Sequence, residues 1–194
     1  MKFAHSSIAA ALALAFSGAV FAQANTVQRD ANQQQRIEQG LQSGSLSTRE
    51  AAKLEKEETK VEKDQARAMR DGRLSPAEKA RLAREQNQVS RDIYREKHDA
   101  QTGNPNSASS QRMQADVQRN INQQNRIEQG VQSGSLTTRE TAKLEAGQAR
   151  DTRAEAHAGA DGNVSAKEQA RLRKKENRQS ARIHREKHDA QTKK

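Results

Sequence analysis

Apolar residues recur along most of this chain at the three- and four-residue spacing of an α-helix. Two such stripes stand out in the first half of the chain: Ala51, Leu54, Val61 and Ala68 form one, and Leu82, Val89 and Ile93 form the other. Ala, Gln, Glu, Arg and Lys fill most other positions, there are only 2 prolines, and runs of β-branched residues are absent. These residue types favour helix in the interior of a segment. The pattern therefore predicts an all-α protein without strands.

Four short segments interrupt the helical spacing, and all four have the same order of residues. Each contains a glycine, any residue, an aliphatic residue, a serine or threonine and, three positions later, a glutamate; the glycines are Gly44, Gly72, Gly134 and Gly162. The hydroxyl oxygen can accept a hydrogen bond from the backbone N–H of the glutamate, whose carboxylate can accept one from the backbone N–H of the hydroxyl residue. This reciprocal pair is a capping box. Each segment therefore predicts a tight turn that begins a new helix.

The chain is also a tandem duplication, because residues 27–102 recur as residues 117–192 at a constant offset of 90 positions. Each copy predicts three helices separated by two glycine turns. In the first copy, the expected helices span roughly 26–40, 47–70 and 75–100. Short connections make neighbouring helices antiparallel.

The domain boundaries follow from this repeat. We expect a first helical module over residues 23–102 and a second over residues 111–194. Between them, residues 103–110 have the sequence GNPNSASS, which predicts a flexible linker. The second module should pack more loosely, because Asp151 and Gln179 replace two valines of the apolar stripes.

The first 22 residues differ in character from the rest. A lysine at position 2 precedes an apolar run over residues 8–16, which small residues follow, as in a secretory signal peptide. Cleavage would fall after Ala22 or Ala24, and the run is too short to span a bilayer. We therefore expect residues 1–22 to be a signal peptide and the protein to be periplasmic or secreted. Once the leader is removed, no transmembrane segment is expected.

Large apolar side chains are scarce outside the leader. All 3 phenylalanines lie within it, Tyr94 is the only other aromatic residue, and the chain has no cysteine to form disulfides. A conventional compact core is therefore not expected. Pairing of the apolar stripes between chains would stabilise such sparse helices, so a homo-oligomer fits the pattern.

The sequence contains no recognisable catalytic motif. Serines occur in the turn segments and the linker, and neither GxSxG nor a glycine-rich phosphate loop is present. We therefore predict a protein that is not an enzyme and carries no cofactor.

The glycine turns resemble the second half of an EF-hand loop, which has glycine in sixth place and glutamate in twelfth. Calcium binding also needs oxygen ligands early in the loop, and only Asp71 and Asp161 supply a carboxylate there. With Glu78 and Glu168 in the last place, these acids predict weak calcium binding. The capping box alone is the alternative interpretation.

Two histidines suggest a second metal candidate. His184 and His188 are one helical turn apart, so both imidazoles would lie on one face and could hold zinc, copper or nickel weakly. The first copy has Tyr94 in place of His184, and the spacing fixes no third ligand. A solvated helix face is the alternative.

Charge is the feature in which the copies differ most. The chain carries a formal net charge of +10, and its acids and bases are interleaved everywhere except near its end. The bases concentrated there are Arg171, Arg173, Lys174, Lys175, Arg178, Arg182 and Arg185. Such a helix would attract an anionic surface such as lipopolysaccharide or membrane headgroups. Solubility and the helix dipole offer a plainer explanation, and sequence-specific nucleic-acid binding is not expected because stacking aromatics are scarce.

Several motifs together carry a resemblance to a family. RIEQG, SGSLT, DGxxS and KHDAQ, in this order, resemble an uncharacterised group of exported bacterial helical-repeat proteins. The resemblance covers nearly the whole chain after the leader and implies export and helical structure, but no activity. A weaker similarity is to small periplasmic stress chaperones with LTxxQ motifs, here LSTRE, LSPAE, LTTRE and VSAKE, with Glu in place of Gln.

These observations lead to three hypotheses. The leading one is an exported binding protein that is not an enzyme and uses its cationic last helix on anionic surfaces. The alternatives are an ion-responsive protein with EF-hand-like turns and a protein similar to the stress chaperones.

Overall fold

The computed structural model describes the backbone of residues 11–189 and the side chains of residues 23–189. The described part contains helices and turns but no strand, which confirms the all-α prediction. The helices are α1 (Ala11–Ser43), α2 (Thr48–Ala68), α3 (Pro76–Lys97), α4 (Ala108–Gln132), α5 (Thr138–Ala158) and α6 (Ala166–His188). Residues 1–10 of the predicted signal peptide lie outside the described residues, and residues 11–22 form the first part of α1. No helix within residues 11–189 is both long enough and apolar enough to cross a membrane.

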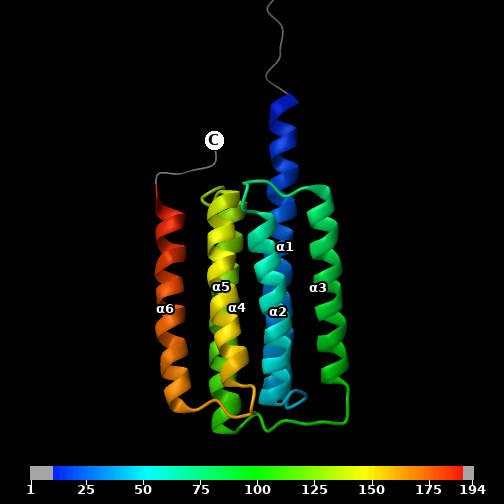
Figure 1. Cartoon of the computed structure of the whole chain (residues 1–194), viewed down its shortest axis with the longest axis vertical. Coiled ribbons are helices and arrows are strands. Elements are labelled where there is room, and N and C mark those ends of the chain that lie inside the picture. Colours follow the sequence, from blue (N-terminus) through cyan, green and yellow to red (C-terminus); the bar gives the residue numbers. More distant parts are fainter. Residues whose placement is uncertain (1–10, 190–194) are drawn as a thin grey trace, which may run out of the picture.

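The helices form one bundle in which helices consecutive in the sequence run antiparallel (Figure 1). The first and third helices of each copy pack parallel to each other, as the contacts of Arg29 with Asn87 and of Arg36 with Ser90 show for α1 and α3. The outer helices are α3 and α6, and α1, α2, α4 and α5 lie between them (Figure 1). The most extensive packing joins equivalent helices of the two copies, namely α2 with α5 and α1 with α4. The copies therefore share one interior, in which each covers the apolar stripe of the other.

Capping boxes begin four of the helices, as predicted. Ser47, Ser75, Thr137 and Ser165 each accept a hydrogen bond from the N–H of the glutamate three residues later and donate their own N–H to its carboxylate. The preceding glycines all have positive φ, from 74° to 89°, which only glycine adopts without strain. The turn chemistry is local, so the sequence predicts it well.

The connection between the copies differs from the flexible linker expected over residues 103–110. The Gly103 N–H donates to the Gly44 carbonyl at 2.8 Å, which fixes the segment against the first glycine turn. The last residues of the segment belong to α4, which begins at Ala108. Ser107 caps α4 by accepting a hydrogen bond from the Ser110 N–H. The serines of the segment therefore start a helix, in keeping with their preference for the N-cap.

The bundle buries more than the scarcity of apolar residues predicts. Its largest apolar cluster joins residues of both copies, including Ile37 and Leu41 from the first and Val117 and Ile121 from the second. Acids and amides fill much of the remaining interior; the fully buried ones include Glu55, Glu58, Gln65, Gln124, Glu145, Gln148 and Glu155. The second copy provides the surface against which the apolar stripes of the first copy pack.

Of the two polar replacements in the second copy, Gln179 finds a hydrogen-bond partner inside the bundle, whereas Asp151 keeps a buried oxygen, Oδ2, without one. Gln179 is buried and donates from Nε2 to the Leu144 carbonyl at 2.8 Å. Gly147 makes this possible, because a side chain there would collide with the amide of Gln179. A glycine on the facing helix therefore makes room for Gln179, which stands in place of one of the two valines.

Candidate functional site: a basic groove between α5 and α6

A groove runs along the second copy, where α6 packs beside α5. One part of it is a hollow of about 490 Å³ and the adjoining part is one of about 330 Å³. The charged groups lining the two parts are mostly basic: Arg150, Arg153, Arg171, Lys175, Arg178 and Arg182, with His157 beside them. We call these seven residues and the surface between them the basic groove.

Helical spacing brings the bases together. Arg150 and Arg153 are three residues apart on α5, and His157 follows four residues later, so all three lie on one face. On α6, the spacing from Arg171 to Lys175 and onward to Arg182 has the same effect. The Gly162 turn makes the two helices antiparallel and places these faces side by side.

The same positions in the first copy have a different charge balance. The groove-lining positions of the second copy carry six Arg or Lys and two acids, whereas their counterparts 90 positions earlier carry four Arg or Lys and five acids. Four acids of the first copy are replaced: Glu57 by Gly147, Asp64 by Ala154, Glu85 by Lys175 and Asp92 by Arg182. The groove is therefore basic because the second copy has lost acids on both helices.

The two copies also differ in the ion pairs that their basic side chains form. In the first copy, Arg67 pairs with Asp64 at 3.0 Å and Arg95 pairs with Asp92 at 2.6 Å. In the described part of the chain, none of the six Arg and Lys side chains of the basic groove has an acid within 4.0 Å. Five of them are exposed, and Arg182 is partly buried. Their positive charge is available to a ligand.

Of the two acids in the groove, Glu168 is hydrogen-bonded in a capping box and Asp151 is buried. Glu168 accepts the N–H and the hydroxyl of Ser165 in a capping box, and these hydrogen bonds lower its pKa. Asp151 is only 5% exposed. Burial raises the pKa of Asp151 to about 6, against the opposing effect of Lys175, Arg150 and the other bases around it. Glu168 is thus held by its capping box, and Asp151 attracts the surrounding bases from a buried position without forming an ion pair with them in the described chain.

This arrangement can hold an extended anionic ligand. Arginine presents a planar fork of donors that matches phosphate and carboxylate oxygens, and lysine adds a point charge. From residue 171 to residue 182, the bases of α6 span about 16 Å at the rise of an α-helix. The lining of the groove offers no hydroxyl or thiol nucleophile.

The sequence identified only part of this surface. Of the seven α6 bases predicted to bind anions, four line the groove, whereas Arg173, Lys174 and Arg185 lie elsewhere on the helix. The contribution of Arg150 and Arg153 from α5 was missed, because it depends on which helix packs against α6. Alignment of the two copies would have indicated the groove, because it shows that the second copy lacks four acids that the first copy has on these helix faces.

The EF-hand-like acids occupy turns rather than a common centre. The Arg73 N–H donates to Asp71 at 2.9 Å and the Asn163 N–H donates to Asp161 at 2.8 Å. Glu78, like Glu168, is held in its capping box. A guanidinium of the other copy also lies at each turn: Arg139 donates to the Asp71 carbonyl and Arg49 donates to the Asp161 carbonyl. These positive charges disfavour a cation at either turn.

The rings of the two histidines lie against each other on an exposed helix face. The ring centroids of His184 and His188 are 4.2 Å apart with the ring planes tilted by 34°, and Nδ1 of His188 lies 2.7 Å from the His184 carbonyl oxygen. Tyr94 and His98 occupy the matching positions of the first copy, where the rings are stacked with centroids 4.1 Å apart. The structure brings no described acid or third histidine to this pair.

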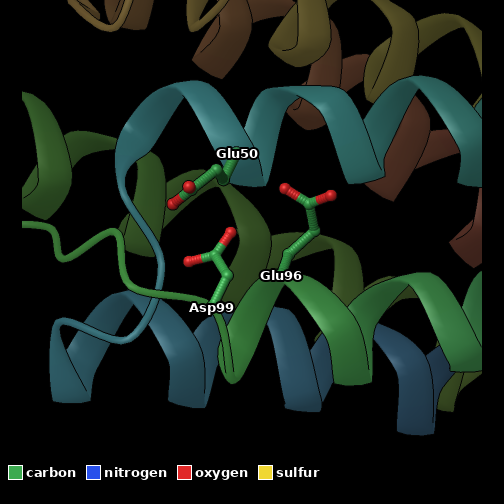
Figure 2. Close-up of side chains that lie close together, drawn as sticks. All are labelled: Glu50, Glu96 and Asp99. Carbon is green, nitrogen blue, oxygen red and sulfur yellow. The ribbon is translucent and has the colours of Figure 1, made fainter.

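Carboxylates do converge at two other places that the sequence did not single out. One group consists of Glu50, Glu96 and Asp99 (Figure 2), and the other of Glu140, Glu186 and Asp189. Within each group, one oxygen per residue lies within 4.8 Å of the others. In each group the first glutamate is far in the sequence from the other two acids, which are three positions apart in the repeated REKHDAQT segment. The contact between the first glutamate and this segment depends on helix packing.

Comparison with known proteins adds no relative to this description. No family model matches the chain, and no curated protein and no solved structure matches it either.

Proposed function

We propose that this protein is an exported helical binding protein, not an enzyme, whose basic groove binds phosphate groups displayed on an anionic surface. The observation that carries this proposal is the charge of the groove. Six Arg and Lys side chains from two helices line one groove without an ion-pair partner in the described chain. Neighbouring like charges repel one another, and an anionic ligand relieves that repulsion.

The shape of the groove favours a surface over a single small anion. The bases are spread along the groove rather than gathered around one point, so several phosphates at intervals would satisfy them better than one. Lipopolysaccharide and phospholipid headgroups both present such arrays. Binding of this kind is multivalent and weakens as salt screens the charges.

The first copy supplies a direct test. In the groove variant, Lys175→Glu, Arg178→Gln and Arg182→Asp introduce the residues that the first copy carries at the same places on α3. The fold accepts these residues in the first copy, so the variant should remain helical. We expect at least a tenfold loss of affinity for phosphatidylglycerol vesicles and for lipopolysaccharide, and no binding of phosphatidylcholine vesicles by either protein.

A matched variant controls for net charge. The surface control, Arg73→Glu, Arg84→Gln and Arg91→Asp, makes the same change of charge at exposed positions of the first copy. It should keep most of the wild-type affinity. An equal loss in both variants would mean that overall charge, rather than the groove, drives binding. Competition by inorganic phosphate at low concentration would point to a free anion as the ligand.

Export is part of the same proposal, and the packing of the first described side chains supports one cleavage position. Gln23 accepts a hydrogen bond from the Thr138 hydroxyl, and Ala24 belongs to a buried cluster that includes Ile127. Cleavage after Ala22 would retain these contacts, whereas cleavage after Ala24 would remove them. Mass spectrometry of the exported protein should therefore give Gln23 as its first residue.

A further inference from the structure

Glu50, Glu96 and Asp99 come from three different places in the first copy. Glu50 is in the first turn of α2, Glu96 is near the end of α3, and Asp99 follows that helix. Figure 2 shows the three side chains in the space between the two helices. The same three residue types meet in the second copy as Glu140, Glu186 and Asp189, 90 positions later.

One oxygen of Glu50 has a structural role and the other has none. Oε2 accepts hydrogen bonds from the Ser47 N–H at 2.8 Å and from its hydroxyl at 2.9 Å. Oε1 is buried and accepts no hydrogen bond, in a residue that is only 5% exposed. Glu140 repeats this arrangement at 2% exposure, with its own Oε1 buried and without a donor. A buried carboxylate oxygen without a partner costs free energy, which a bound cation would offset.

The other two capping boxes provide an internal comparison. Glu78 and Glu168 cap α3 and α6 in the same way, yet neither leaves a buried oxygen without a partner. Neither belongs to a group of three carboxylates in the described chain. The buried unpartnered oxygen is therefore not a by-product of the capping box. It occurs only at the two boxes where other acids converge.

The balance of charge at each group suits a divalent ion. Lys53 Nζ lies 2.7 Å from Glu96 Oε1, and its counterpart Lys143 lies 4.0 Å from Glu186. In the first copy, three carboxylates and one ammonium leave two negative charges, which one divalent cation would neutralise. All the converging ligands are oxygens, as hard cations such as Ca²⁺ prefer, and the exposure of Asp99 leaves room for water ligands.

Divergence of the two copies gives separate support. The second copy has lost four acids of the first on the helix faces that line the groove, but all three members of this group are present in both copies. Glu55 and Glu78 also recur in the second copy, as Glu145 and Glu168. The carboxylate group therefore belongs to the set of acids that both copies share.

We propose that each copy binds one hard divalent cation through this carboxylate group, with Glu50, Glu96 and Asp99 as ligands in the first copy and Glu140, Glu186 and Asp189 in the second. The ion would join the start of α2 to the end of α3, and the start of α5 to the end of α6. This inference is independent of anion binding by the basic groove.

Calorimetric titration of the full chain with CaCl₂, up to the millimolar range, tests the proposal. We expect two ions per chain and a higher melting temperature in calcium than in EDTA. The variant Asp99→Asn with Asp189→Asn removes one carboxylate from each group and leaves every capping box intact, so it should stay folded and lose both sites. Circular dichroism checks that its helices remain.

The matched control is Asp71→Asn with Asp161→Asn, which alters the EF-hand-like turns by the same chemistry. It should bind calcium as the wild type does. The proposal would be overturned by a wild-type chain that takes up no calcium, by unchanged binding in the Asp99 and Asp189 variant, or by loss of binding in the control.

Discussion

Gln65 donates a hydrogen bond from Nε2 to Oδ2 of Asp30 at 2.7 Å, deep inside the bundle. At the equivalent positions of the second copy the acid and the amide are exchanged. Asn120 stands in place of Asp30, Glu155 stands in place of Gln65, and Asn120 donates to Glu155 at 2.7 Å. Each copy thus keeps one acid and one amide in contact, on opposite helices. This buried acid–amide contact is therefore common to both copies, although the helix that carries the acid differs.

The buried acids predict that stability falls as pH rises. Burial raises the pKa of Asp30 and Glu55 to about 7 and that of Glu176 to about 8. The ordinary pKa values are 3.8 for Asp and 4.5 for Glu. At pH values between the ordinary pKa and the raised pKa of each group, the folded chain therefore binds more protons than the unfolded chain. Protons therefore favour the folded state, and the stabilisation is lost as pH rises through the folded pKa values. Urea unfolding should give a larger free energy at pH 5 than at pH 8; the opposite order would contradict these assignments.

Glu58 should contribute strongly to this pH dependence. It is 0% exposed, neither of its carboxylate oxygens has a hydrogen-bond partner, and burial followed by the nearby Asp30 and Glu55 raises its pKa well above the ordinary value. The second copy has Gln148 at this position. Glu58→Gln should therefore raise the free energy of unfolding at pH 8 by about 1–3 kcal/mol and change it little at pH 5.

The reverse substitution is the control for Glu58. Gln148→Glu places an acid in the same environment of the second copy and should destabilise the chain at pH 8 more than at pH 5. Equal effects at both pH values would show that packing, rather than ionisation, determines the result.

Close packing at a helix end gives a third prediction. A methyl group at Gly130 would lie 2.5 Å from Cδ1 of Leu136, a fully buried residue whose N–H donates to the Gly130 carbonyl at 2.9 Å. Gly130→Ala should destabilise the chain by about 1–3 kcal/mol, although alanine is the better helix former. Gln132→Ala, at an exposed position in the same turn, should have little effect in the same urea titration. A stabilised Gly130→Ala variant would show that Leu136 can move away.

What the sequence predicts well is local. The capped starts of α2 and α3 and the buried stripes through Leu54 and Ile93 depend on neighbours a few residues away, and they are confirmed. The first helix, predicted over 26–40, has no such capping signal, and α1 begins earlier, at Ala11. The pairing of the copies is not local, and neither is the burial of residues such as Glu62 and Glu155, which helical periodicity alone assigns to the surface. Buried acids are recognisable only when the other copy is in place.

The candidate sites also depend on contacts between residues that are distant in the sequence. A base-rich α6 is visible in the sequence, but the groove also needs bases from α5 and the absence of acids between them. The carboxylate group joins Glu50 to Glu96 and Asp99 across two helices, and no motif spacing predicts that contact. Exposed large apolar side chains, which a stress chaperone would need, are limited to Tyr94 in the described chain, at 61% exposure.

Salt should weaken the proposed surface binding sharply. The bases of the groove are largely exposed, so their attraction to phosphates is screened over about 8–10 Å at physiological ionic strength. Cosedimentation with phosphatidylglycerol vesicles should fall steeply between low and physiological salt, and the groove variant should show a much shallower dependence. A salt-independent interaction would indicate an apolar contact instead.

The most direct measurement is the affinity for phosphatidylglycerol vesicles of the wild type, the groove variant and the surface control, at one low ionic strength. If Lys175, Arg178 and Arg182 act as part of a groove, the groove variant should bind at least tenfold more weakly than the surface control, although both carry the same net charge. Equal affinities of the two variants would contradict the assignment of the groove as the binding site.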